Sequence, residues 1–241
     1  MPAFHEAAKL LLLRAASGHR ALQGLRWRQH GLGMIQAEFS EALRVHIWHP
    51  RLRTLPVSSF EPGSSFREVH DHRFDLTSAV IVGEIIDVPF WAEPWDQKTE
   101  MTPGEPWSRW RRTKAWEILH AKIQPGARAQ GCSTATEHEP LGDYGACPKT
   151  ERESSWPRYP AGSVYTIPRR EFHTTRLNPE VGEGLAITVV HRDNFDERLA
   201  RVLGSEEEAR WSAIVPEDAR SGALREWVLQ EAGDALNNLR G

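Results

Sequence analysis

Residues 70–86 read HDHRFDLTSAVIVGEII, and this stretch decides the expected fold. Its second half, Thr77 to Ile86, is the most strand-like segment of the chain, because branched valine and isoleucine side chains suit a pleated sheet. Gly83 interrupts the run where a bulge or a tight bend is expected. The stretch therefore predicts β-structure that bends at Gly83.

Other segments with strand character lie on both sides of this stretch. They alternate in polarity or are rich in β-branched and aromatic residues, and they cover 44–50, 57–60, 66–72, 116–123, 162–168 and 184–191. A Trp-rich segment at 89–112 suggests an inserted hairpin or lid, and residues 131–160 have no clear periodicity and suggest a long loop. A block of roughly six to eight short strands predicts a barrel or a sandwich.

Both ends of the chain are predicted to be helical. Residues 6–25 suit one or two helices broken near Ser17-Gly18, with an apolar face of Ala7, Leu10, Leu11, Leu13 and Leu22. A short helix is expected from Ser205, and residues 216–239 suit another, with Ala223, Leu224, Trp227, Val228, Ala232 and Leu236 on one face. We expect a single domain over 1–241, with a helical cap at about 3–30, a β-barrel at about 34–195 and helices at about 205–240.

Composition narrows the class of partner. The 241 residues are 39% hydrophobic and 26% charged, as in a globular protein, and the net charge of −3 predicts no binding to nucleic acid or to an anionic membrane. The apolar run from Leu10 to Leu13 is too short to span a bilayer, and no signal peptide is evident. A small-molecule partner and a cytoplasmic location are expected, with Cys132 and Cys147 as ordinary thiols.

His70 and His72 are the first candidates for chemistry. Strand side chains alternate with period two, so both rings point to one face, which inside a barrel is the lumen. Two imidazoles on one face can share a metal ion, but this spacing alone is a weak signal, and an exposed strand is the alternative interpretation. His46 and His49 are not at a spacing that puts both rings on one strand face, so no rival ligand pair is expected there.

A wider set of residues gives the pair a context. Gly63 precedes it, Gly83 follows it, and a second segment reads Gly162-x5-Pro168-x4-His173-x4-Asn178. This arrangement resembles the two motifs of the cupin superfamily, from about Arg44 to His191. The resemblance implies an antiparallel cupin-type β-barrel, a double-stranded β-helix, with His173 as the third metal ligand. The chain departs from the pattern at Arg170, which stands where the family has glycine, and at Asn178, which is displaced by one residue.

A carboxylate ligand is missing from the pattern. The slot where cupins commonly carry glutamate holds Leu76 or Thr77, while Asp75 falls on the wrong pleat and Glu84 outside the slot. Three neutral imidazoles leave the full charge of a divalent ion to attract a thiolate or carboxylate. The site thus resembles that of the three-histidine thiol dioxygenases, such as cysteine dioxygenase.

That resemblance implies roles for further residues. Iron(II) is the expected ion, although nickel, copper, zinc and manganese also suit such ligands. Arg44 is the counterpart of an arginine that binds the substrate carboxylate, or else a solvated arginine at a strand end. His191 is a candidate catalytic residue, which would donate a proton or hydrogen-bond to bound oxygen. The alternative interpretation is a histidine at the barrel rim or surface. The cysteine–tyrosine crosslink of the family has no evident equivalent.

Two further residues are candidates for substrate binding. Arg73 lies beside the ligands and is expected either to pair with Asp75 at the barrel mouth or to form a surface ion pair of little value. Tyr165 is a candidate that suits the barrel core equally well.

The predicted function is a dioxygenase that uses O2 to oxidise a small thiol-bearing amino acid, such as cysteine, at sulfur. The alternatives are a metal-dependent cupin oxygenase or isomerase acting on a non-thiol small molecule, and a cupin that binds a small ligand without turnover. A homodimer formed through edge strands is an expectation from the resemblance alone.

Overall fold

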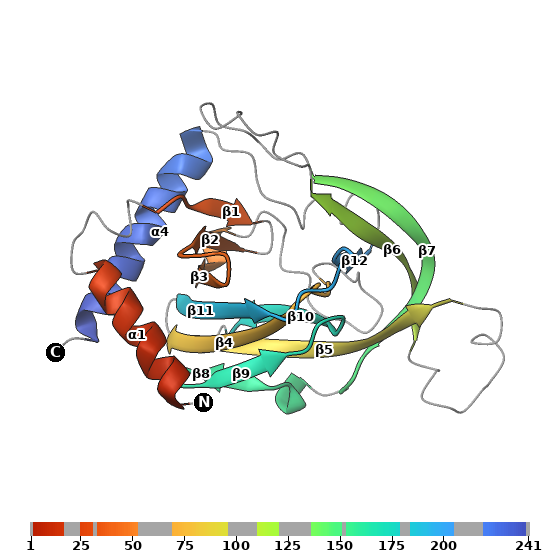
Figure 1. Ribbon diagram of the computed structural model, residues 1–241, viewed down its shortest axis with the longest axis horizontal. Helices are drawn as coiled ribbons and strands as arrows, with labels where there is room; N and C mark the ends of the chain where they lie inside the picture. Colours follow the sequence, from red (N-terminus) through yellow and green to blue (C-terminus); the bar gives the residue numbers. More distant parts are fainter. Residues whose placement is uncertain are drawn as a thin grey trace.

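A computed structural model describes residues 2–16, 25–30, 33–52, 69–95, 110–120, 136–150, 153–178, 184–204 and 219–239. These residues are mainly β, in two antiparallel sheets, with a helix near each end of the chain (Figure 1). The helices are α1 (Pro2–Ala16) and α4 (Ala219–Asn238), and the short 3-10 turns are η1 (Pro50–Leu52) and η3 (Glu153–Ser155). No helix in the described ranges combines the length and the apolar character needed to cross a bilayer.

The first sheet has the order β1-β2-β3-β11-β4-β9. Its strands are β1 (Arg28–His30), β2 (Met34–Glu38), β3 (Leu43–Trp48), β11 (Ala186–Asp193), β4 (Asp75–Val82) and β9 (Val164–Ile167). The second sheet has the order β10-β5-β7-β6-β12, and β8 also pairs with β5. Its strands are β10 (Phe172–Leu177), β5 (Glu84–Pro94), β7 (Thr136–Pro148), β6 (Arg111–His120), β12 (Arg201–Leu203) and β8 (Arg158–Pro160).

Gly83 divides the most strand-like segment between the two sheets. β4 ends at Val82 and β5 starts at Glu84, and Gly83 between them has φ of 74°. A Cβ atom at this position would lie 2.1 Å from the carbonyl oxygen of Leu185. The predicted bend is confirmed, and only glycine fits it, because the backbone is left-handed and the neighbouring strand is too close for a side chain.

The two faces of the first sheet have different neighbours. Val45, Ile47 and Val189 belong to a core that the helices cover, whereas Trp48 and Val190 belong to a second core on the opposite face. Both helices lie along the outer side of this sheet (Figure 1). The parity of a residue in β3 or β11 therefore decides whether its side chain meets a helix or the interior.

The helix predictions are confirmed unevenly. In α4 the predicted face is confirmed for Val228, Ala232 and Leu236, which lie in the core, whereas Ala223 at its start is exposed. In α1 the expected face is wrong: Leu10 is 54% exposed, whereas Ala8 and Leu12 are buried. The run of four leucines gives no unique face, so packing against the sheet selects Leu12.

A closed barrel is not present among the described residues. The edge strands of the second sheet, β10 and β12, are instead connected through isolated bridges of His70, which pairs with His173 on one side and with Val202 on the other. The prediction of a mainly β fold with terminal helices is confirmed. β1 and β12 also lie outside the segment of about 34–195 expected to hold the strands.

The prediction of a loop over 131–160 is wrong for much of that range. β7 spans 13 residues and pairs with β6 over most of its length. Its prolines and glycines hide the strand signal, and Gly142, with φ of 110°, lies at an irregularity of the β6–β7 register. β5 likewise continues to Pro94, into the Trp-rich segment. The predicted features at 17–18, 57–63, 96–109, 124–126 and 205–218, including Gly63, lie outside the described residues.

Candidate metal centre

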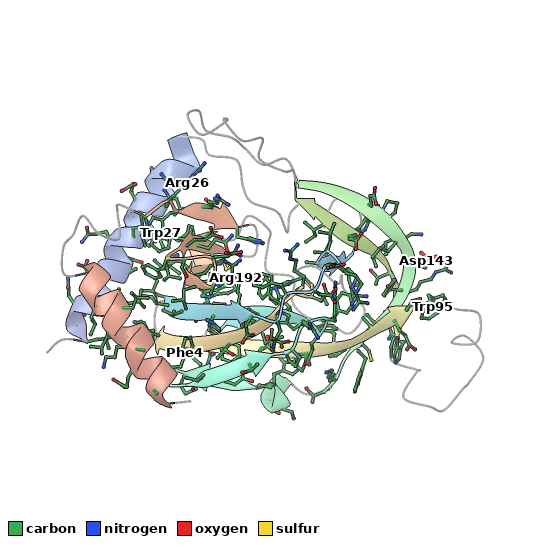
Figure 2. All side chains as sticks on the ribbon, viewed as in Figure 1. Phe4, Arg26, Trp27, Trp95, Asp143 and Arg192 are labelled. Carbon is green, nitrogen blue, oxygen red and sulfur yellow. The ribbon has the colours of Figure 1, made fainter. Side chains whose placement is uncertain are left out.

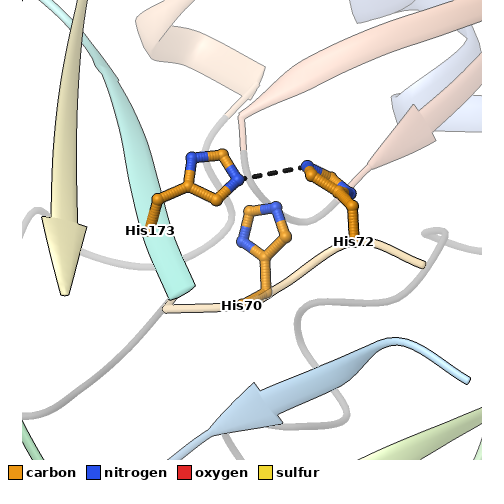
Figure 3. A group of neighbouring side chains, drawn as sticks. All are labelled: His70, His72 and His173. Carbon is orange, nitrogen blue, oxygen red and sulfur yellow. Dashed lines mark hydrogen bonds between the residues drawn. The ribbon is translucent and has the colours of Figure 1, made fainter. Parts of the chain in front are cut away.

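The three predicted ligand histidines lie together (Figure 3). One ligand nitrogen from each of His70, His72 and His173 lies within 4.8 Å of those of the other two. The Nε2 atoms of His72 and His173 are 3.1 Å apart. Two nitrogens bound at right angles to one ion, at about 2.1 Å each, would be about 3.0 Å apart. The spacing therefore suits two ligands of a single ion.

The backbone sets the positions of two of these rings. His70 N–H donates to the carbonyl of His173, and His173 N–H donates to the carbonyl of His70, each at 2.9 Å. Residues that exchange both hydrogen bonds in an antiparallel pair present their side chains on the same face. The two ring centroids are accordingly 4.6 Å apart.

Asp71 fixes the orientation of the segment from the other side. Its buried carboxylate accepts hydrogen bonds from Arg201 N at 2.6 Å and Arg201 Nε at 2.7 Å, and Arg170 Nη1 lies 3.8 Å away. Burial raises the pKa of Asp71, while the charge and hydrogen bonds of Arg201 oppose this shift. Because alternate residues point to opposite sides, anchoring Asp71 in this way turns His70 and His72 toward His173.

Asp87 orients the third histidine. The distance from His173 Nδ1 to Asp87 Oδ1 is 2.7 Å, and both side chains are buried. A carboxylate accepts, so Nδ1 carries the proton and donates, and Nε2 is left as a free electron pair aimed at the other rings. Asp87 was not among the site residues predicted from the sequence, although it is the one acidic residue in the apolar run from Ile85 to Phe90.

His72 is held in the neutral form that can bind a metal. Burial lowers its pKa well below 6.5, and the nearby His70 and His173 lower it further. Phe74 stacks on the His72 ring, with centroids 5.1 Å apart and an angle of 19° between the planes. An unprotonated, immobilised imidazole is ready to ligate without first losing a proton.

Neither of the carboxylates considered from the sequence, Asp75 and Glu84, joins the histidine group among the described residues. Asp75 accepts hydrogen bonds from Arg169 N and Asn194 Nδ2, each at 2.8 Å. Glu84 accepts one from Asn178 Nδ2 at 2.7 Å. The candidate ligand set is three imidazoles, which suits a divalent transition metal and leaves its identity open.

Arg170 takes the left-handed conformation for which the family pattern has glycine. Its φ is 67°, its N–H donates to the carbonyl of His72 at 2.9 Å, and its guanidinium pairs with Asp196 at 3.2 Å. The side chain also donates to the carbonyl of Leu199 at 2.5 Å. These contacts compensate for the unfavourable backbone conformation of a residue with a Cβ atom.

The other predicted site residues are dispersed. Arg44 lies on the inner face of β3, binds Glu38, and is close enough to lower the pKa of His72 electrostatically. The guanidinium of Arg73 lies 5.6 Å from the ring of Phe195, at the partly exposed rim. It does not form the expected pair with Asp75, whose partners are those given above.

Tyr165 packs in the inner core. Its ring stacks on Tyr159, with centroids 4.1 Å apart, and burial raises its pKa. This position matches the core alternative that the sequence left open.

His191 does not lie with the ligand group. Its ring is 6.3 Å from that of Phe4 in α1, on the helix-covered face of β11. The neighbouring Val190 faces the interior, and the period of two sends His191 the other way. The hypothesis that His191 lies beside the metal ligands is therefore wrong, because His191 and Val190 point to opposite faces of β11.

No protein-family model matches the chain, and no curated protein matches it.

Proposed function

We propose that this protein is a cupin-type, non-haem iron(II) dioxygenase that oxidises a small thiol-bearing amino acid, such as cysteine, at sulfur with O2. The observation that carries the proposal is the convergence of His70, His72 and His173, a group that no carboxylate joins within the described part of the chain. Two facing sheets that exchange the chain at Gly83 and near Arg170 support a cupin-type arrangement.

The charge of the ligand set favours an anionic substrate. Three neutral imidazoles would leave the whole charge of a divalent ion uncompensated, and a thiolate or carboxylate is attracted to such a centre. Iron(II), when bound, would supply the activation of O2 that no amino-acid side chain provides.

The residues of the chain would bind and orient the substrate. Asp87 holds the proton of His173 at Nδ1 and keeps the ring in place. Arg44, on the interior side of β3, offers a planar fork that matches a carboxylate. Trp48, Val190 and Tyr165 form an apolar core beside this face, which limits the access of water.

The test begins with the metal. Purified protein is analysed for its metal content, loaded anaerobically with iron(II), and assayed in an oxygen electrode with cysteine and other thiols. We expect one ion per chain, O2 consumption with a thiol, and a sulfinate product. His173→Ala should abolish both metal binding and O2 consumption, whereas His5→Ala, on α1, should change neither.

Two results would contradict the proposal. Iron-loaded protein that consumes no O2 with any thiol is not a thiol dioxygenase, and consumption with carbon acids alone would favour a non-thiol oxygenase. Full metal binding by the His173→Ala variant would contradict the proposed metal site at the three histidines.

A further inference from the structure

The ring of His72 is held differently from that of His173. His173 donates from Nδ1 to the buried carboxylate of Asp87 at 2.7 Å, as metal-ligating histidines usually do. The Nδ1 atom of His72 has no hydrogen-bond partner among the described residues. Because the torsion about the Cβ–Cγ bond of histidine has no narrow intrinsic preference, a packing contact is needed to fix this ring.

Phe74 supplies such a contact. It follows His72 by two residues, on the same side of the extended chain, and the two rings are nearly parallel, with centroids 5.1 Å apart and 19° between the planes. Turning the imidazole about its Cβ–Cγ bond would drive its edge into the phenyl face. The stack therefore holds Nε2 of His72 where it lies, 3.1 Å from Nε2 of His173.

Phe195 packs against Phe74 in turn. The centroids of the two phenyl rings are 5.3 Å apart, with 53° between the planes. Phe195 is 44% exposed, so three rings run in series from the candidate ligand His72 to the surface.

Hydrogen bonds hold the loop that carries the outermost of these rings. Asn194 Nδ2 donates to Asp75 at 2.8 Å, and Asp196 N–H donates to the carbonyl of Arg73 at 2.6 Å. Asp75 and Arg73 are the sequence neighbours of one phenylalanine, and Asn194 and Asp196 are the neighbours of the other. These two bonds therefore place the two phenyl rings opposite each other.

Two guanidinium groups pack on the same pair of rings. Cζ of Arg192 lies 5.5 Å from the ring centre of Phe74 and 5.8 Å from that of Phe195, and Cζ of Arg73 lies 5.6 Å from the latter. Arg192, labelled in Figure 2, is itself fixed by a hydrogen bond to the carbonyl of Glu41. Cations are attracted to aromatic rings at such distances, so these contacts add to the rigidity of the pair.

We propose that Phe74 and Phe195 are positioning residues of the metal centre: Phe74 fixes the ring plane of His72, and Phe195 holds Phe74 in place. Neither side chain would touch the ion. The inference rests on His72 as a metal ligand in the proposed function above, and it is independent of the substrate and of the reaction.

Loss of the stack would affect one ligand only. His70 and His173 are joined by two backbone hydrogen bonds of 2.9 Å each, and Asp87 holds the ring of His173. None of these contacts involves Phe74. Without the phenyl ring, His72 would turn freely and the ion would keep the other two histidines.

The first experiment uses cobalt(II), because its visible absorption depends on the number and geometry of its ligands. The metal-free full-length chain is titrated with cobalt(II) in competition with a chelator. Phe74→Leu, which keeps an apolar side chain but loses the flat ring, should bind about tenfold more weakly and should absorb like His72→Ala. Phe74→Tyr keeps the ring and should retain the affinity and the spectrum of the wild type.

The second experiment separates positioning from packing. Every variant is saturated with cobalt(II) below its melting temperature, so that a loss of stability alone leaves the spectrum of the wild type. Phe195→Leu should change the spectrum in the same direction as Phe74→Leu but less, because it acts through Phe74. Phe195 is partly exposed, so this variant carries the test if Phe74→Leu does not fold.

Phe4→Leu is the matched control. Phe4, on α1 and labelled in Figure 2, lies 6.3 Å from the ring of His191, a histidine outside the ligand group. It should leave cobalt(II) affinity and absorption unchanged. A saturated Phe74→Leu with the spectrum of the wild type would overturn the inference, whatever its melting temperature, and so would a His72→Ala that still absorbs like the wild type.

The outcomes also separate this inference from the proposed function. The expected cobalt(II) results, combined with iron-loaded protein that consumes no O2 with any thiol, would support the positioning role and contradict the dioxygenase. Thiol-dependent O2 consumption, combined with an unaltered cobalt(II) site in Phe74→Leu, would support the dioxygenase and overturn the positioning role.

Discussion

At the level of single residues, Asp87 orients a candidate metal ligand without being a ligand itself. It is buried and lies 2.7 Å from His173 Nδ1, but it is not one of the candidate ligands. Such carboxylates keep the tautomer and the ring orientation of a ligating histidine, and losing one typically weakens metal binding 10–100-fold, an order-of-magnitude range.

We therefore expect Asp87→Asn to weaken metal affinity by about tenfold or more, measured by competition with a chelator of known affinity. Asp193→Asn is a matched control, because Asp193 lies 3.9 Å from His191, which is outside the ligand group. Equal metal affinity in the wild type and in Asp87→Asn would show that the hydrogen bond does not orient His173.

Arg170 combines an unfavourable backbone with favourable side-chain contacts. Glycine at this position would remove the cost of the left-handed conformation but would also lose the contacts to Asp196 and Asp71. Alanine would lose the same contacts and keep the cost, which is roughly 1–2 kcal/mol.

We expect both variants to lower the free energy of unfolding in urea, with Arg170→Ala lower than Arg170→Gly by about 1 kcal/mol. The comparison isolates the backbone contribution, because both variants lack the guanidinium. An alanine variant as stable as the glycine variant would mean that φ of 67° is relaxed when the side chain is removed.

At the level of secondary-structure elements, Gly83 leaves much less room for a side chain than Gly162 does. A Cβ atom at Gly83 would require a left-handed backbone and would lie 2.1 Å from the carbonyl oxygen of Leu185, just before β11. At Gly162 the backbone is also left-handed, with φ of 94°, but a Cβ atom there would have nothing within 4 Å. The two glycines therefore share the conformational requirement and differ in the available space.

We expect Gly162→Ala to lower the free energy of unfolding by about 1 kcal/mol, and Gly83→Ala by about 3 kcal/mol or more. Chemical denaturation of both variants measures the difference. Similar losses at the two positions would show that the chain shifts near Leu185 at little energetic cost.

The sequence predicted the elements whose pattern is local. β4, β11 and the buried face of α4 follow from period and residue type, and the grouping of the three candidate ligand histidines follows from the motif spacing that resembles that of the cupins. β7 was missed because its prolines and glycines weaken the local strand signal, and the strand is formed by pairing with β6 on one side and β5 on the other. Such pairing is a long-range property that local residue type does not encode.

At the level of the whole molecule, the residues that the sequence analysis missed come together only by long-range strand pairing. Asp87 meets His173 because β5 pairs with β10, and Arg192 approaches Arg44 because β11 pairs with β3. His191 was misplaced for the same reason in reverse: a shift of one residue moves a side chain to the opposite face of the sheet. The spacing of the motifs is enough to identify the three candidate ligand histidines. The residues around them depend on strand register, which the sequence alone does not give.

The enclosed interior also makes stability depend on pH. Burial is the main reason that the pKa values of His46 and His72 lie well below 6.5 in the folded protein, and both should return to about 6.5 on unfolding. Between these values the unfolded chain binds protons that the folded chain does not. The free energy of unfolding should therefore be constant with respect to these groups above pH 6.5 and fall below it, by up to about 1.4 kcal/mol per pH unit for each histidine.

Urea denaturation of the metal-free protein at pH values from about 7.5 to about 5.5 measures this dependence. Ordinary carboxylates stay ionised over this range. His46→Phe should reduce the slope below pH 6.5, since one of the two buried imidazoles is removed, and it should leave the slope above pH 6.5 unchanged. An unfolding free energy that rises on acidification, or a slope that His46→Phe does not alter, would mean that water or a counter-ion reaches these rings in the folded state. The interior would then be too wet to favour a buried carboxylate ligand over its hydrated form, because charge–charge attraction weakens as the local dielectric constant rises.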